Sequence, residues 1–218
     1  MSSRLSRRTF LTGAMGLVVA GTAVARTEGK SGTMQTRFDL DRFIDEAKRA
    51  AKETDSQAAV EEVLRRAVAD PQAILDAIGE PTEVGIHTLH RAADLTVLNV
   101  VWAPLMVLLP HNHGMWASIG IYTGREDNIV WERRGGVIEA TDAEALSVRE
   151  VYRLPDDAIH SVTNPIRKLT GAIHIYGGDF FAVPRSEWDA ETLAERPFDL
   201  EAARRLFVEA NERFKATR

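Results

Sequence analysis

The sequence contains no cysteine. A chain without cysteine forms no disulfide, offers no thiolate to a metal ion and has no cysteine nucleophile. Histidine, aspartate and glutamate are therefore the side chains left for metal binding. The same absence means that cysteine usage carries no sign of the redox compartment in which the protein works.

The sequence also has little excess charge and few aromatic residues. Its formal net charge is -5, its pI is about 5.7, and 7% of its residues are aromatic. Because binding to nucleic acid or to an acidic membrane surface needs a basic patch, we expect neither partner. A small molecule is the expected partner. With 218 residues, 44% of them hydrophobic, the chain is long enough for one cored domain.

The N-terminus has the features of an export signal. Arg7 and Arg8 precede an uncharged run that ends in Ala23-Val24-Ala25, the small-x-small pattern of a signal-peptidase site. The run is too short and too rich in glycine for a membrane span. Residues 6–11 resemble the twin-arginine consensus, whose export route carries proteins that are already folded and loaded with cofactor.

Residues 1–25 are therefore predicted to be a twin-arginine signal peptide, and residues 26–36 a linker. This interpretation implies a periplasmic or otherwise exported protein without stable membrane association after cleavage. The alternative is a cytoplasmic protein whose translation starts at Met34.

The rest of the chain, residues 37–218, predicts one mainly β domain flanked by helices. Residues 38–80 carry apolar side chains at helical spacing, with Pro71 as the first residue of one helix. Residues 84–183 change to short β-branched runs separated by turn residues, which is typical of a sandwich or barrel. Residues 199–215 return to a helical pattern that begins with an aspartate, a residue type that caps helix N-termini.

Two histidines lie two residues apart within the β region, in Pro110-His111-Asn112-His113. Side chains alternate between the two faces of a strand, so His111 and His113 point the same way. They can offer two imidazole nitrogens to one metal ion. A third ligand is expected from another strand.

The region around these histidines resembles the two sequence motifs of the cupin superfamily. The matching residues are Pro110, His111, His113 and Gly124 in the first motif and Pro155, His160 and Asn164 in the second. The resemblance spans about residues 84–181. It implies a double-stranded β-helix, a jelly-roll barrel that binds one metal ion through His111, His113 and His160.

Two residues depart from the cupin pattern. Ala117 stands where the glutamate ligand of the first motif usually falls, and Asp157 replaces the usual glycine of the second. Three neutral imidazoles leave the charge of the site at that of the metal and leave coordination positions open. A thiolate and O2 could then bind together.

Within the cupins, a three-histidine site without the glutamate resembles the cysteine dioxygenase family. Trp102 agrees with a tryptophan of that family, and His174 and Tyr176 match its Ser-x-His-x-Tyr strand, although Ala172 replaces the serine. The resemblance implies an enzyme that binds Fe(II) and uses O2 to convert a small thiol, of the cysteine or 3-mercaptopropionate type, to its sulfinate. Tyr176 and His174 would be its catalytic residues, and Tyr176 stays a plain phenol because no cysteine can be joined to it.

That family also uses an arginine to hold the carboxylate of its substrate. In the early-strand region the nearest arginine is Arg91, and His87 or His90 could take its place. The charged segment Arg125-Glu126-Asp127 is interpreted as a solvated turn without chemistry.

Two alternatives to thiol oxidation stay open. One is a cupin metalloenzyme with Mn, Ni or Zn that acts as an isomerase, a hydrolase or a non-thiol oxygenase. The other is a metal- or ligand-binding protein without turnover.

The export signal gives the first testable prediction. Replacing Arg7 and Arg8 together by lysine should trap the precursor in the cytoplasm, because the twin-arginine route reads this pair. Cell fractionation and N-terminal sequencing of the native protein check this, with Arg26 as the expected first residue. A native protein that begins at Met34 would contradict the prediction.

Overall fold

The computed structural model describes residues 37–217 of the chain. The predicted signal peptide and linker lie outside these residues. The described part follows the order expected from the sequence, with three helices first, then the strands, then one last helix. None of the helices in this part is long and apolar enough to cross a membrane.

The three N-terminal helices each begin behind an aspartate. They are α1 (Leu40–Ala50), α2 (Ser56–Val68) and α3 (Pro71–Ile78). In each case the carboxylate of the preceding aspartate accepts a hydrogen bond from a backbone N–H three residues further on, which satisfies one of the free donors of the first turn. The prediction of helices over residues 38–80, with Pro71 as a helix start, is confirmed.

The strands form two antiparallel sheets. The first sheet has the order β1 (Gly85–Arg91), β2 (Thr96–Trp102), β9 (Thr170–Tyr176), β4 (Ala117–Thr123) and β7 (Val151–Leu154). The second has the order β11 (Glu195–Pro197), β10 (Ser186–Trp188), β3 (Val107–Asn112), β8 (Ile159–Thr163), β5 (Arg125–Arg134) and β6 (Val137–Ser147).

The connections between the sheets define a jelly roll. From β2 to β5 and from β6 to β10 each strand lies in the other sheet from the one before it, which gives the orders β2-β9-β4-β7 and β3-β8-β5-β6. This order is that of the double-stranded β-helix, and the predicted fold class is therefore confirmed. The prediction placed the end of the barrel at residue 183, whereas β10 and β11 extend the second sheet beyond it.

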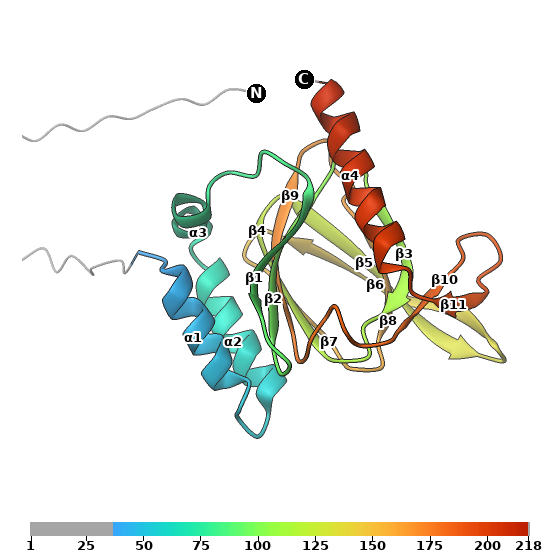
Figure 1. Cartoon of the computed structure of the whole chain (residues 1–218), viewed down its shortest axis with the longest axis horizontal. Helices are drawn as coiled ribbons and strands as arrows, with labels where there is room; N and C mark the ends of the chain where they lie inside the picture. Colours follow the sequence, from blue (N-terminus) through green and yellow to red (C-terminus); the bar gives the residue numbers. More distant parts are fainter. Residues whose placement is uncertain (1–36, 218) are drawn as a thin grey trace, which may run out of the picture. The chain divides into compact units, whose positions relative to one another are not determined.

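The central strands of the first sheet, β2, β9 and β4, are buried on both faces and separate two cores. On β9, Ile173 and Ile175 point outward and pack with side chains of α1, α2 and α3. Their neighbours Ala172, His174 and Tyr176 point into the barrel. The helices therefore cover one face of this sheet and leave its other face to the interior (Figure 1).

The last helix, α4 (Leu200–Ala216), is capped by Asp199, as predicted for residues 199–215. Figure 1 shows α4 on the other side of β1 and β2 from α1 and α2. Its Phe207 packs on Trp102 of β2, with ring centroids 5.1 Å apart. Helix α4 thus closes the interior of the barrel at one side.

Candidate metal centre

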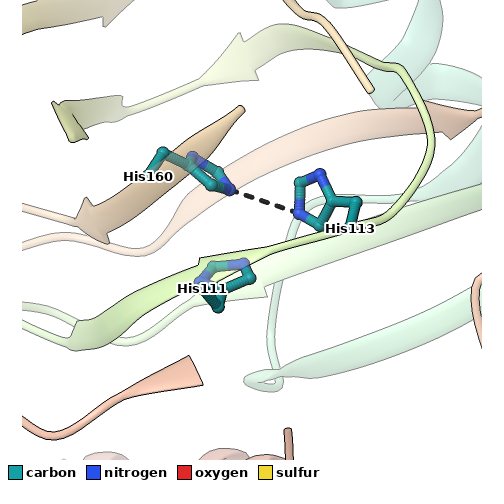
Figure 2. Close-up of side chains that lie close together, drawn as sticks. All are labelled: His111, His113 and His160. Atoms are coloured by element: carbon teal, nitrogen blue, oxygen red, sulfur yellow. Dashed lines mark hydrogen bonds between the residues drawn. The ribbon is translucent and has the colours of Figure 1, made fainter. Parts of the chain in front are cut away.

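Three histidines meet inside the barrel. His111 lies on β3, His113 directly follows that strand, and His160 lies on β8, where it pairs with His111 across the sheet. Each offers one ring nitrogen, and these atoms all lie within 4.8 Å of one another. Figure 2 shows the three rings converging on one point. The structure therefore brings together the three histidines that the sequence predicted as metal ligands.

Hydrogen bonds orient two of these imidazoles. Nδ1 of His111 lies 2.9 Å from the carbonyl oxygen of Leu109, and Nδ1 of His160 lies 2.7 Å from Oδ1 of Asn128. Because an oxygen of this kind only accepts, both Nδ1 atoms carry the proton and both Nε2 atoms keep a free lone pair. This is the form in which histidine binds a metal through Nε2.

His113 completes the group without a partner of its own at Nδ1. Its Nε2 lies 3.2 Å from Nε2 of His160 (Figure 2). Its Nδ1 is buried and has no hydrogen-bond partner among residues 37–217. Two ring nitrogens this close need a proton or a cation between them, and the lone pair on Nε2 of His160 can bind either.

Burial keeps the three rings neutral. Loss of solvation lowers the pKa of His111 to about 4, and it lowers the pKa of His113 and of His160 well below the usual value for histidine. Neutral imidazole is the ligand form, so no proton has to leave at neutral pH before a metal binds. The group could therefore hold a metal ion.

His174 and Tyr176 face the same cavity from the first sheet. The hydroxyl of Tyr176 lies 3.2 Å from Nδ1 of His174, and the ring of Tyr176 meets the edge of His113 at 5.0 Å between centroids. Burial raises the pKa of Tyr176, so its hydroxyl stays protonated. The pair predicted from the sequence thus lies beside the three histidines, and all five side chains line one cavity.

The interpretation of Arg125-Glu126-Asp127 as a solvated turn was wrong for its central residue. The segment opens β5, and Glu126 points into the barrel with none of its surface exposed. Arg125 and Asp127 point outward and pair with each other at 2.7 Å. Alternation along the strand is the physical reason, because it places every second residue of a charged stretch inside.

The early-strand candidates for carboxylate binding do not reach the cavity. Arg91 lies at the surface and forms a two-pronged ion pair with Asp179, at 2.8 and 2.9 Å. His87 is exposed on the outer side of β1, and neither it nor His90 lines the cavity. Strand β1 is an edge strand, and only its Ile86 faces the cavity.

Arg185, which the sequence did not reveal, packs against Phe180 and Phe198, two residues that line the cavity, but is not itself among the lining residues. Its guanidinium lies over the rings of Phe180 and Phe198, 4.2 and 4.3 Å from their centroids, and donates to the carbonyl oxygen of Phe180. Its Nε and Nη2 are buried and have no hydrogen-bond partner in the part of the chain that the structure describes. Burial lowers its pKa.

The charge of Arg185 acts on the site. It lowers the pKa of His111, of His113 and of Tyr176, in each case as a smaller effect than burial. Arg185 lies in the segment between β9 and β10, which has no periodic pattern. Only the fold, which returns this segment to the cavity, makes the residue visible as a candidate.

Comparison with known proteins finds similar solved structures but no family. No family model matches the sequence. Among solved structures, the chain is similar to an RmlC-like cupin family protein with a double-stranded β-helix fold from Methanocaldococcus jannaschii, at 8% identity and a TM-score of 0.40 over 47% of this chain and 86% of that one.

Two further structures show similar values. A protein from Bacillus halodurans gives 15% identity and a TM-score of 0.43 over 48% of this chain and 77% of that one. An oxalate decarboxylase from Bacillus subtilis gives 12% identity and a TM-score of 0.35 over 42% of this chain and 23% of that one. Similarities at this level do not identify a reaction, which has to come from the residues of the site.

Metal binding by the three histidines is directly testable. Replacing His111, His113 or His160 singly by alanine should lower bound metal well below one equivalent, because each change removes one of three lone pairs. The fold should survive, since the core of the barrel is apolar. Elemental analysis and circular dichroism of each variant check this, with exposed His87→Ala as the control. Full metal occupancy in all three variants would refute the assignment.

Proposed function

We propose that this protein is an Fe(II)-dependent thiol dioxygenase that acts on a small thiol with a carboxylate group. The observation that carries the proposal is the placement of a three-histidine group, without a carboxylate ligand, beside the His174–Tyr176 pair in one buried cavity. The reaction is R–SH + O2 → R–SO2H, in which both oxygen atoms pass to sulfur. Bound iron would supply the positions at which thiolate and O2 meet.

Residues of the chain can accept the proton that the substrate thiol loses. A thiol binds a metal as the thiolate, so its proton has to leave. The hydroxyl oxygen of Tyr176 faces the cavity and can take that proton while the Tyr176 proton passes to Nδ1 of His174. Tyrosine stays neutral throughout, in agreement with its raised pKa. Its hydroxyl then donates a hydrogen bond to the reacting atoms of the substrate.

Arg185 supports a substrate with a carboxylate. A guanidinium with two unused buried donors gains from a planar anion that accepts both. Contacts with Phe180 and Phe198 fix the orientation of the guanidinium, which lowers the entropic cost of binding a carboxylate. Cysteine and 3-mercaptopropionate carry such a group, and cysteamine does not.

The walls of the cavity are largely apolar. They are formed by apolar side chains of β1, β2, β3 and β8 and by Leu200, Ala203 and Phe207 of α4. Interactions between charges and hydrogen-bonding groups are stronger in such a place than in water. A dry cavity also protects reactive oxygen chemistry from side reactions.

Metal analysis and oxygen uptake test the proposal together. The purified protein should contain iron, or gain activity when loaded with Fe(II), and should consume O2 with cysteine or 3-mercaptopropionate. One sulfinate should form for each O2 consumed. Stoichiometric Mn, Ni or Zn with no thiol-dependent O2 uptake after iron loading would favour another metalloenzyme or a binding protein.

The hydroxyl of Tyr176 is expected to be essential. Tyr176→Phe should keep iron yet lose about a hundredfold or more in turnover, because the variant lacks a positioned donor and proton carrier in a dry site. Oxygen-electrode kinetics of the iron-loaded protein measure this. Tyr122→Phe is the matched control, since it loses a buried hydroxyl that bonds Asn99 away from the cavity. Equal turnover in wild type and Tyr176→Phe would show that this tyrosine is structural.

Arg185 is expected to select for the carboxylate. Arg185→Gln should lower kcat/KM for 3-mercaptopropionate by about 10- to 100-fold, the range expected when charged hydrogen bonds of about 1.5–3 kcal/mol are lost. The small rate with cysteamine should not fall. Arg91→Gln, which changes a surface arginine, is the control. A loss of the same size for both thiols would mean that Arg185 acts on the fold or the metal group and does not recognise the carboxylate.

A further inference from the structure

Glu126 is a carboxylate sealed inside the barrel. Its side chain has no exposed surface, and each of its oxygens accepts a hydrogen bond. Oε2 accepts from the indole N–H of Trp102 at 2.8 Å, and Oε1 accepts from Nδ2 of Asn128 at 3.1 Å. Burying a carboxylate costs free energy unless its neighbours are donors, and these neighbours all present N–H groups.

Through Asn128, Glu126 is linked by hydrogen bonds to His160 of the metal group. A carboxylate only accepts, so the amide of Asn128 has to turn its NH2 towards Glu126. The oxygen of the same amide then faces Nδ1 of His160 at 2.7 Å, which requires the proton of that ring to be on Nδ1. Nε2 of His160, the atom that points at His113, keeps its lone pair.

Glu126 also lies close to His174, the partner of the proposed proton carrier Tyr176. Oε2 lies 3.4 Å from Nε2 of His174; both side chains are buried, and Nε2 has no hydrogen-bond partner among residues 37–217. A carboxylate at this distance favours a proton on Nε2, which leaves Nδ1 to accept from the hydroxyl of Tyr176 at 3.2 Å. Glu126 occupies this place in a chain where Ala172 offers no hydroxyl beside His174.

We infer that Glu126 is a positioning residue that fixes the proton on both histidines, on Nδ1 of His160 through the hydrogen bonds of Asn128 and on Nε2 of His174 through the charge of its carboxylate 3.4 Å away. One buried carboxylate thereby prepares a metal ligand on one sheet and a proton acceptor on the other. Glu126 touches neither substrate nor metal in this role.

The ring nitrogens that carry the proton in His160 and His174 can be measured without bound metal and without an activity assay. Long-range 1H–15N correlation spectra of the metal-free protein should show His160 with its proton on Nδ1 and His174 with its proton on Nε2. His160 protonated on Nε2, or His174 protonated on Nδ1 alone, would overturn the inference. This measurement uses the wild-type protein and does not depend on any variant folding.

Glu126→Gln gives the second test. The amide of glutamine has to place its NH2 towards either Asn128 or the Trp102 and His174 side, so at least one of the two protonation sites should change. If Asn128 turns over, Zn2+ affinity should fall by about 10- to 100-fold. Thr170→Val is the control, since it removes a fully buried hydroxyl that is hydrogen-bonded to the backbone of Arg125, the residue before Glu126. Wild-type protonation at both histidines together with wild-type Zn2+ affinity in folded Glu126→Gln would refute the role.

The inference rests on the proposed function only in that it makes His160 a ligand and His174 the partner of a catalytic tyrosine. The two can fail separately. Protonation sites as expected in a protein that oxidises no thiol would refute the thiol reaction and leave the role of Glu126 intact.

Discussion

The burial of polar side chains inside the barrel is the constraint on which the site depends. A polar group buried without a partner costs about 1–3 kcal/mol, so each imidazole, hydroxyl and carboxylate inside has to be matched by the protein. The same burial lowers the pKa of the three histidines and raises that of Tyr176, which leaves neutral ligands and a protonated phenol. Both forms are the ones that the proposed chemistry needs.

The two sheets supply different parts of the site. The metal group belongs to the second sheet and the loop that follows β3, whereas His174 and Tyr176 belong to the first. The first sheet is packed by helices on its outer face, which holds β9 firmly in place. Glu126 on β5 of the second sheet accepts from Trp102 on β2 of the first, and so joins the two halves across the interior.

Local patterns in the sequence predicted what depends on local order, and missed what depends on the fold. Helical spacing predicted the flanking helices, and the two-residue spacing of His111 and His113 predicted a shared direction. Glu126 was missed because Arg125 and Asp127 beside it make the segment resemble a turn, and only pairing with β6 and β8 makes it a strand. Arg185 was missed because nothing near it in the sequence indicates that its segment folds back over the cavity.

Helix α4 contributes to the wall of the cavity but holds none of the proposed site residues. Ala203 and Phe207 line the cavity from this helix, while the histidines, Tyr176 and Glu126 all come from the strands or the loop after β3. Phe207 packs on Trp102, whose indole N–H donates to Glu126, whereas a change of side-chain size at Ala203 alters the cavity and touches no strand pairing. The volume of the cavity can therefore change at one position of a terminal helix, with the metal group and its supporting hydrogen bonds left as they are.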